Sequence, residues 1–338
     1  MRVGILGAGG MGNVHATQYA KMPDVEARFF EWDPEKAKAF AERHGAIPTA
    51  SVDALIAESD VVDVCVPTDL HLDYGLRAIA SGRAVFMEKP MARTLEEAAR
   101  LMEAAAKANV ALMPGQVVRY FPEFRKAREL VASGAIGVPA AARTRRGGAA
   151  PKGSQGWFLD HARSGGVLFD LAIHDFDWLR WTLGEVRSLY ARSVGAQRKS
   201  GPDYALTTLS FDEGAVAHVE ATWMDPSGFR VAFEVCGSEG MIEHDSRNTA
   251  TVRAHLAHPA EGEGGDPRQA AARKASAEAP LAPTDDPYYG ELRAFLDAVN
   301  MGAPPPVSPL DGWMAMSISL AALESARTGR MASPARMA

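Results

Sequence analysis

Cysteine is scarce in this sequence of 338 residues, which contains only Cys65 and Cys236, far apart and each within an apolar run. A disulfide-held secreted scaffold is therefore excluded, because such folds need a dense set of cysteines. We expect two reduced core thiols in a cytoplasmic protein. The nine histidines form no H-E-x-x-H pattern, and none lies at metal-ligand spacing from a cysteine. We therefore expect no metal.

Long apolar runs and clusters of basic residues are also missing. No run approaches the roughly 20 residues of a membrane-spanning helix, although 47% of the residues are hydrophobic. Met1 and Arg2 lead directly into a strand-like segment, so we expect neither a signal peptide nor a membrane anchor. The formal charge of −6 is spread over both signs, which argues against nucleic acid as a partner. A small-molecule partner is the better expectation.

Strand-like and helix-like segments alternate over the first 120 residues, a pattern typical of βαβ units and a parallel sheet. Helices are expected between the strands; Asp33 is a candidate N-cap of the second, and Gly45 follows its end. We predict an α/β protein whose residues 1–120 form a doubly wound Rossmann domain. Six strands are expected, at 2–7, 25–32, 46–50, 61–67, 84–90 and 110–116.

The pattern changes after Tyr120 and predicts an α+β domain over 121–338 with an open, mostly antiparallel sheet. Segment 230–237 is expected to continue the hairpin of 204–211 and 215–223 as an antiparallel neighbour. Residues 254–283 lack periodicity and are expected to form a surface excursion. The free face of the sheet would join copies into a homodimer or homotetramer. Other strands are expected at 140–146 and 187–195, and helices at 122–133, 166–183, 288–300 and about 308–328, the last packing back on the first domain.

A glycine-rich loop joins the first expected strand to the first expected helix. Gly7, Gly9 and Gly12 of GILGAGGMGNVH show G-x-G-x-x-G spacing, which allows a tight turn, the approach of a pyrophosphate and close packing of helix on strand. Glu31 follows 19 positions after Gly12 at the end of the second strand. A carboxylate there would bind ribose hydroxyls and repel a 2′-phosphate. The alternative is a structural turn beside a solvated glutamate. The context favours a dinucleotide site, with NAD preferred over NADP.

Lys89 follows the apolar run of AVFMEKP. Ligands of a doubly wound sheet bind outside the carboxyl ends of the strands, so this position delivers an ammonium to the cofactor edge, and Pro90 stiffens the backbone beyond it. On position alone, a solvated lysine at a strand end explains the pattern equally well.

The phrase EKP, following VPTDLHLDYGLRAIASGRAVFM, resembles the Gfo/Idh/MocA family of sugar and cyclitol oxidoreductases. The segments GQVVRYFPEF, SGAIG, SGGVLFDLAIHDFDWLRW and PVSPLDGWMAMSISLAALESARTG resemble later motifs of that family in the same order. The resemblance implies that Lys89 lies at the nicotinamide and touches the reacting hydroxyl, and that the Lys89–Pro90 bond is cis. Together with the glycine loop, it indicates the cofactor-binding residues Gly7, Gly9, Gly10, Met11, Gly12, Glu31, Pro67, Thr68, His71, Glu88 and Lys89.

The segment GGVLFDLAIHDFDWLRW is expected to form one helix, with Asp170 and His174 four residues apart on its polar face. Alone, such residues more often compensate the helix dipole or serve a structural role. The resemblance implies that they are the substrate-side catalytic pair. Because a group that titrates near neutrality suits proton transfer, His174 is the expected base. Lys89 would stabilise charge on the reacting oxygen, and Asp170 would orient the imidazole or a neighbouring hydroxyl.

Four further positions bear on specificity. Val167 stands where many family members have a third glycine, and Glu31 replaces a commoner aspartate. Arg119 resembles a family arginine near the domain junction, where it would contact the substrate or form a structural ion pair. Trp157 would line the substrate site or pack in the core.

The leading hypothesis is an NAD(P)-dependent dehydrogenase that transfers hydride between nicotinamide and a secondary hydroxyl of a sugar, sugar acid or cyclitol. A second class is an NAD-assisted glycosidase, and nothing in the residues excludes it. A third is a non-catalytic sensor of dinucleotide or sugar. Lys89, Asp170 and His174 argue against the sensor, because a sensor needs no proton acceptor beside the nicotinamide.

Overall fold

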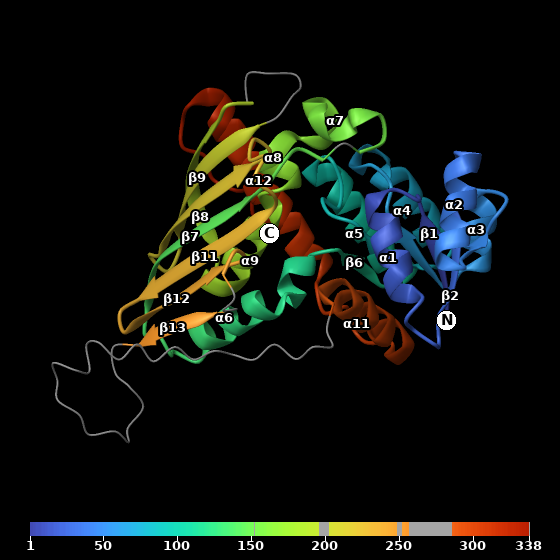
Figure 1. Ribbon diagram of the computed structural model, residues 1–338, viewed down its shortest axis with the longest axis horizontal. Helices are drawn as coiled ribbons and strands as arrows, with labels where there is room; N and C mark the ends of the chain where they lie inside the picture. Colours follow the sequence, from blue (N-terminus) through green and yellow to red (C-terminus); the bar gives the residue numbers. More distant parts are fainter. Residues whose placement is uncertain (152, 196–202, 249–251, 257–285, 338) are drawn as a thin grey trace.

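The computed structural model describes residues 1–151, 153–195, 203–248, 252–256 and 286–337. Figure 1 shows two lobes side by side, each built on its own sheet. None of the helices within these ranges combines the length and the hydropathy that a membrane crossing requires.

The first lobe confirms the predicted doubly wound sheet. Its six parallel strands have the order β3-β2-β1-β4-β5-β6, so the order reverses between β1 and β4. The central strands are almost wholly buried, as expected where helices cover both faces. The ligand crevice of such a sheet opens at the reversal, outside the carboxyl ends. The strands are β1 (Arg2–Leu6), β2 (Glu26–Phe30), β3 (Ile47–Pro48), β4 (Val61–Val64), β5 (Ala84–Met87) and β6 (Leu112–Pro114).

The second helix of this lobe begins and ends where the sequence predicts. Asp33 caps the second helix by accepting hydrogen bonds from the backbone of Glu35 and Lys36, and Gly45 ends it with a φ of 65°, a left-handed conformation that favours glycine. The helices are α1 (Gly10–Tyr19), α2 (Pro34–His44), α3 (Val52–Glu58), α4 (His71–Ala80) and α5 (Leu95–Ala108), with 3₁₀ turns η1 (Thr68–Leu70) and η2 (Val117–Tyr120).

One late helix, α11 (Pro287–Met301), also packs on the first sheet. Its buried residues Leu292, Phe295 and Leu296 share a core with Val3 and Phe86 of β1 and β5. The chain therefore passes into the second lobe near residue 120, but α11, which comes much later in the sequence, packs on the first lobe.

The second lobe holds a mixed sheet of seven strands, largely antiparallel, in the order β13-β12-β11-β7-β10-β9-β8. β9 and β10 form the predicted hairpin. The expectation that segment 230–237 lies beside this hairpin is wrong, because β7 separates β10 from β11 and runs parallel to β10. The strands are β7 (Pro139–Gly147), β8 (Val186–Ser193), β9 (Tyr204–Phe211), β10 (Val216–Thr222), β11 (Arg230–Gly237), β12 (Gly240–Asp245) and β13 (Arg253–Leu256).

The surface excursion expected over 254–283 begins inside a strand, since residues 254–256 belong to β13. The part from 257 onward lies outside the described residues.

Helices cover one face of this sheet (Figure 1). Trp313 of α12 donates its indole N–H to the Leu95 carbonyl of α5 at 3.1 Å, so α12 contacts both lobes. The helices are α6 (Pro122–Ala132), α7 (His161–Ser164), α8 (Gly166–Asp170), α9 (Ile173–Leu183) and α12 (Pro309–Thr328), with the 3₁₀ helix η3 (Ser154–Leu159).

The prediction of a single helix over 166–183 is wrong, because this segment forms two helices, α8 and α9. The Ala172 N–H bonds to the Val167 carbonyl, five residues back, at 2.9 Å. The Asp170 carbonyl, which a continuous helix would pair with the His174 N–H, instead accepts a hydrogen bond from Lys89 Nζ at 2.8 Å. A contact between the lobes thus replaces a helical bond.

Candidate active site

The glycine loop between β1 and α1 leaves backbone N–H groups and space at the start of the helix. Gly7 has a φ of 99°, and a Cβ on Gly12 would lie 2.0 Å from the Gly7 carbonyl oxygen. Gly9 and Gly10 are exposed, and a Cβ on either would meet no atom of the described chain. Gly9 caps α1 without a side-chain hydrogen bond. Because unpaired N–H groups at a helix N-terminus attract anions, the loop fits a pyrophosphate.

Glu31 lies directly beyond β2 and faces this loop. Its carboxylate accepts hydrogen bonds from the backbone N–H of Ala8 at 2.9 Å and of Asp33 at 3.1 Å. Met11 in the first turn of α1 is partly buried against the hydrophobic core of the first lobe. The placement of Glu31 fits a carboxylate that binds ribose hydroxyls.

The loop after β4 carries Pro67, Thr68 and His71 to the same edge of the sheet. Thr68 and His71 are buried. The His71 ring nitrogens lie 2.9 Å from two carbonyl oxygens, those of Pro90 and Val66. Burial lowers the pKa of this imidazole. Because both ring nitrogens are engaged by the backbone, His71 supports the rim rather than presenting a group to a ligand.

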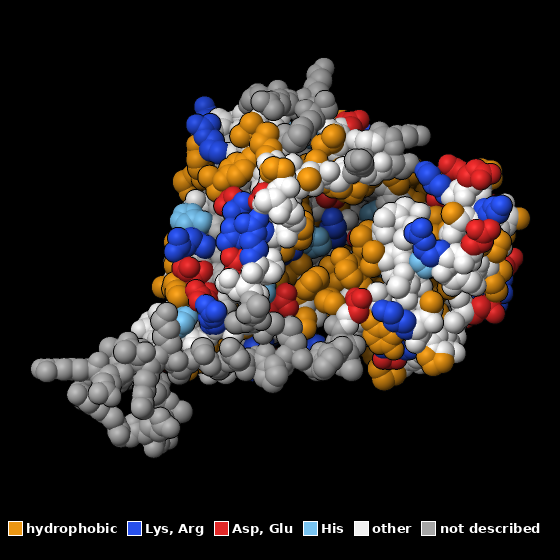
Figure 2. Space-filling view, in the orientation of Figure 1, with side chains coloured by type: hydrophobic (Ala, Val, Ile, Leu, Met, Phe, Trp, Pro, Cys, Tyr) orange, Lys and Arg blue, Asp and Glu red, His pale blue; other side chains and the backbone are white. Residues whose placement is uncertain are grey.

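Lys89 follows β5, and its side chain crosses to the second lobe. Nζ lies 2.8 Å from the Asp170 carbonyl oxygen and 3.1 Å from Asp170 Oδ1. The Lys89–Pro90 bond is cis, as the resemblance implies. Figure 2 shows that the surface is hollowed between the lobes, with hydrophobic side chains on the floor and basic and histidine side chains inside the recess.

His174 lies in the first turn of α9, one turn beyond Asp170. Its Nδ1 is buried and has no hydrogen-bond partner among the described residues, although the side chain is partly exposed. Burial, Lys89 and Arg146 lower the pKa of His174 well below its ordinary value. Burial raises the pKa of Asp170, and Lys89 opposes that rise. The site therefore holds a neutral imidazole beside an ammonium. The neutral ring is able to accept a proton, but its lowered pKa differs from the near-neutral titration expected from the sequence, because burial and two cations oppose protonation.

Arg119 forms an ion pair in the interior of the protein. It donates to both oxygens of Asp177 at 2.7 and 2.6 Å, and both side chains are buried. A third contact reaches Asp311 of α12 at 3.3 Å. Burial opposes ionisation of Asp311, but Arg119 and Arg180 lower its pKa to about 2. This geometry favours the structural alternative for Arg119 over substrate contact.

Trp157 lies in η3, partly exposed, with its ring 4.1 Å from that of Phe158. Val167 is fully buried in the hydrophobic core of the second lobe, so its side chain does not narrow the recess between the lobes.

Sequence reasoning missed a buried group of polar residues next to Lys89. His15 of α1 contacts Asp63 of β4, the adjacent Cys65 and Glu88. Spacing gave no hint that Cys65 would meet a histidine, because these residues are 50 positions apart. The available signal was topological, since α1, β4 and β5 all meet at the carboxyl edge of one sheet.

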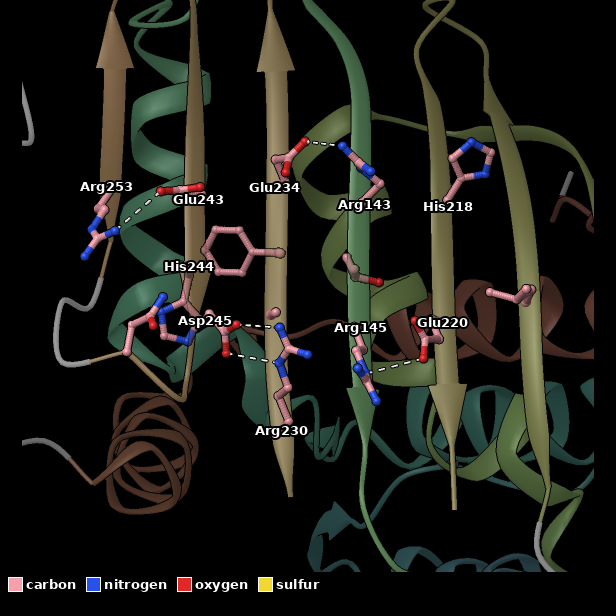
Figure 3. A pocket seen from close by; sticks show the side chains of 15 residues that line it. Arg143, Arg145, His218, Glu220, Arg230, Glu234, Glu243, His244, Asp245 and Arg253 are labelled. Atoms are coloured by element: carbon pink, nitrogen blue, oxygen red, sulfur yellow. Dashed lines mark hydrogen bonds and ion pairs between the residues drawn. The ribbon is translucent and has the colours of Figure 1, made fainter. Parts of the chain in front are cut away.

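A separate cavity of about 530 Å³ lies on the open face of the second sheet, away from Lys89. Figure 3 shows charged side chains of opposite sign facing each other on neighbouring strands. The ion pairs there are Arg143–Glu234, Arg145–Glu220, Arg230–Asp245 and Arg253–Glu243.

Both lobes match models of one protein family. Residues 1–116 match the model described as an oxidoreductase family with an NAD-binding Rossmann fold, and residues 124–243 match the GFO/IDH/MocA C-terminal domain. A myo-inositol 2-dehydrogenase of Thermotoga maritima is 31% identical over 344 aligned residues, covering 96% of each chain. A 1,5-anhydro-D-fructose reductase of Ensifer adhaerens is 30% identical, covering 88% of this chain and 87% of its own.

Solved structures share the fold over nearly the whole length. A levoglucosan dehydrogenase in complex with NADH and levoglucosan superposes with a TM-score of 0.85 at 26% identity, covering 99% of this chain and 100% of its own. GenD2 from gentamicin A biosynthesis, in complex with NAD, gives a TM-score of 0.84 at 27% identity, covering 99% and 97%. The chain therefore belongs to the Gfo/Idh/MocA family and is an NAD-binding oxidoreductase of sugars or cyclitols.

Proposed function

We propose that this enzyme transfers hydride between NAD and a secondary hydroxyl of a cyclitol or a sugar. The observation that carries the proposal is the contact of Lys89 Nζ with Asp170 across the recess. One helical turn further on lies Nδ1 of His174, which has no hydrogen-bond partner among the residues that the structure describes. An inositol dehydrogenase and a levoglucosan dehydrogenase among the similar proteins support polyhydroxylated rings as the substrate class.

In this proposal the chain's own residues hold the cofactor at two places. The uncapped start of α1, with Gly9 and Gly10, binds the pyrophosphate, and Glu31 binds the adenosine ribose. The remaining proposed contacts are the rim residues Gly7, Met11, Gly12, Pro67 and Thr68, with His71 and Glu88 behind them. Bound nicotinamide supplies the hydride acceptor, or the donor in the reverse direction.

The proton of the reacting hydroxyl is moved by the protein. His174 is neutral, because burial and two neighbouring cations oppose its protonation, and it accepts the proton as the alcohol is oxidised. The Lys89 ammonium stabilises the negative charge that develops on the oxygen. Asp170 fixes Nζ through its carboxylate and its carbonyl, so the ammonium is held in place before the substrate arrives.

The test is a screen of NAD reduction over inositols, aldoses, anhydrosugars and uronic acids, with wild type, Lys89→Met, His174→Asn and the surface control Lys107→Met. We expect kcat/KM on the best substrate to fall by about 10² to 10³ for Lys89→Met and by about 10² to 10⁴ for His174→Asn. Lys107 is exposed on α5, so its variant should match wild type.

Equal rates for wild type and Lys89→Met would overturn the proposal. Release of a chromogenic aglycone with bound NAD, without accumulation of NADH, would instead identify an NAD-assisted glycosidase.

We also propose that two copies associate through the open face of the second sheet. Neighbouring strands there present rows of opposite charge, so the face is complementary to a second copy related by a two-fold axis. Leu206 of β9 is 49% exposed beside these pairs. Association of two copies would bury the Leu206 side chain.

A further inference from the structure

His15 lies at the centre of a buried polar network directly behind Lys89. It is on α1, three residues after Gly12, and its side chain is completely buried. Nδ1 lies 2.8 Å from Asp63 Oδ2. Nε2 lies 3.2 Å from Glu88 Oε1, out of line for a hydrogen bond but close enough for an ion pair. The imidazole thus sits between two carboxylates.

The other groups around Asp63 are hydrogen-bond donors. The Tyr19 hydroxyl donates to Oδ2 at 3.0 Å, and the Cys65 thiol donates to Oδ1 at 3.3 Å. Both oxygens of Asp63 thus act as hydrogen-bond acceptors. Nδ1 of His15 must therefore carry a proton, because its lone pair would otherwise face the lone pairs of Asp63.

Glu88 imposes the same requirement on the other side of the ring. Its Oε2 accepts a hydrogen bond from the Lys89 backbone N–H at 3.0 Å, while Oε1 faces His15 Nε2. A protonated Nε2 balances this carboxylate, whereas an unprotonated one would repel it. Both ring nitrogens therefore carry protons. Burial opposes this charge, but Asp63 holds the pKa of His15 well above its ordinary value.

The network reaches Lys89 from the first lobe while Asp170 reaches it from the second. Glu88 fixes the Lys89 N–H, and His71 lies 2.9 Å from the carbonyl oxygen of the next residue, Pro90. The backbone on both sides of Lys89 is thus anchored by buried side chains. The Nζ of this lysine ends 2.8 Å from the Asp170 carbonyl oxygen, so its location depends on where these anchors hold its main chain.

We propose that His15 is a positioning residue for Lys89: as an imidazolium held between Asp63 and Glu88, it keeps Glu88 oriented toward the Lys89 N–H. The inference rests on the proposed catalytic role of Lys89. Further titratable or aromatic groups of neighbouring elements face the ring: Tyr19 of α1, Cys65 after β4, Phe86 of β5, and Tyr288 and Glu291 of α11.

The first test uses wild-type protein labelled with ¹⁵N-histidine. We expect the NMR signals of His15, assigned by their loss in His15→Gln, to show protons on both ring nitrogens at pH 8. A single protonated nitrogen at that pH would overturn the proposal, because a neutral ring does not balance two carboxylates.

The second test measures the position of Lys89 without turnover. The rate at which Lys89 is methylated by formaldehyde and cyanoborohydride is followed by mass spectrometry in wild type, His15→Gln, and the control His218→Gln, which makes the same change on β10 of the second sheet. We expect severalfold faster labelling of Lys89 in His15→Gln only, because a released ammonium is more accessible. Equal labelling in all three would overturn the proposal.

Kinetics then separate positioning from cofactor binding. We expect His15→Gln to lower kcat about 10²-fold, since a displacement of about 1 Å has that effect, while the dissociation constant for NADH stays within about threefold, because the glycine loop is unchanged. Glu88→Gln should lower kcat similarly, and the double variant His15→Gln/Glu88→Gln should lower kcat no further than either single variant, because the two residues act as a unit.

A loss of activity in His15→Gln is informative only if this variant folds. Should His15→Gln not fold, the double variant His15→Gln/Asp63→Asn, which also removes one buried charge, replaces it in every measurement. Inactive Lys89→Met combined with unchanged kcat and unchanged Lys89 labelling in the His15 variants would refute the positioning role alone. An active Lys89→Met would refute the proposed function instead.

Discussion

Arg119 donates two parallel hydrogen bonds to Asp177, at 2.7 and 2.6 Å, in the interior between η2 and α9. Arg119→Met would leave Asp177 buried without its counter-ion, and removal of one partner of such a pair typically lowers the free energy of unfolding by about 3–5 kcal/mol. We expect that loss in chemical denaturation. The exposed control Arg187→Met on β8 should change stability by less than about 0.5 kcal/mol.

The double variant Arg119→Met/Asp177→Leu separates a structural role from substrate contact. It should recover most of the lost stability, because neither charge is then left unpaired. A KM that rises tenfold or more in this stable double variant would show that Arg119 also touches the substrate.

Glu31→Gln should alter cofactor preference. In the proposed function, the substitution removes the negative charge that would accept hydrogen bonds from the ribose and repel a 2′-phosphate. Hydrogen bonds to a charged group contribute about 1.5–3 kcal/mol each. We expect the dissociation constant of NADH to rise about tenfold or more and that of NADPH to fall, as measured by fluorescence titration. Glu35→Gln, an exposed change in the first turn of α2, is the control. An unchanged NADH-to-NADPH ratio in Glu31→Gln would contradict the assignment.

The pH profile of kcat/KM for alcohol oxidation should lose activity on its acid side only below pH 6.5. Burial and Lys89 lower the pKa of His174, so the neutral base persists as the pH falls past the ordinary histidine value. Because Lys89 is one of the two cations that oppose protonation, Lys89→Met should move this loss of activity toward higher pH. The pH dependence of kcat/KM, which reports the free enzyme, gives the measurement. A loss of activity in wild type that begins above pH 7 would be incompatible with the site.

Glu291→Gln should stabilise the protein increasingly as the pH rises. Both carboxyl oxygens are buried without a hydrogen-bond partner among the described residues, and burial, with Glu88, raises the pKa of this group well above 4.5. A raised folded-state pKa means that the stability is present below the unfolded-state pKa and lost above it, by at most about 1.4 kcal/mol per pH unit.

The measurement is the free energy of unfolding at pH 5 and pH 8. The advantage of Glu291→Gln over wild type should be larger at pH 8, whereas Glu213→Gln, in the exposed turn between β9 and β10, should show no such trend. Parallel pH curves for Glu291→Gln and wild type would mean that this carboxyl is not held protonated.

Leu206→Glu should dissociate the proposed dimer. The substitution places a charge at an exposed apolar position among the ion pairs of the open sheet. Light scattering at micromolar concentration should give a dimer or larger assembly for wild type and a monomer for the variant, with NADH binding unchanged. A monomeric wild type would refute association through this face.

The first lobe was predictable because its rules are local. Alternating periodicity, the cap at Asp33 and the glycine at position 45 each depend on residues within a few positions, and the carboxyl-edge rule then brings Lys89 to the recess. The place of β11 was not predictable in this way. Its partner β7 is about 90 residues earlier, and a hairpin pattern describes only sequential neighbours.

The site shows the same limit at the level of side chains. The expected helix over 166–183 obeyed its own periodicity, but Lys89 from the other lobe takes the Asp170 carbonyl and the helix breaks there. His15 lies on α1, Asp63 on β4, and Glu88 directly after β5, and only the strand order makes them neighbours. Long-range pairing of this kind leaves no trace in a window of ten or twenty residues.

The packing of α11 against the first sheet has a practical consequence for dissecting the enzyme. A fragment ending near residue 120 would keep every strand and every glycine of the nucleotide fold, yet it would lose Leu292, Phe295 and Leu296 from over β1 and β5. The uncovered apolar surface would favour aggregation of that fragment during expression. Supplying residues 286–302 as a tethered segment is the direct way to obtain a soluble half.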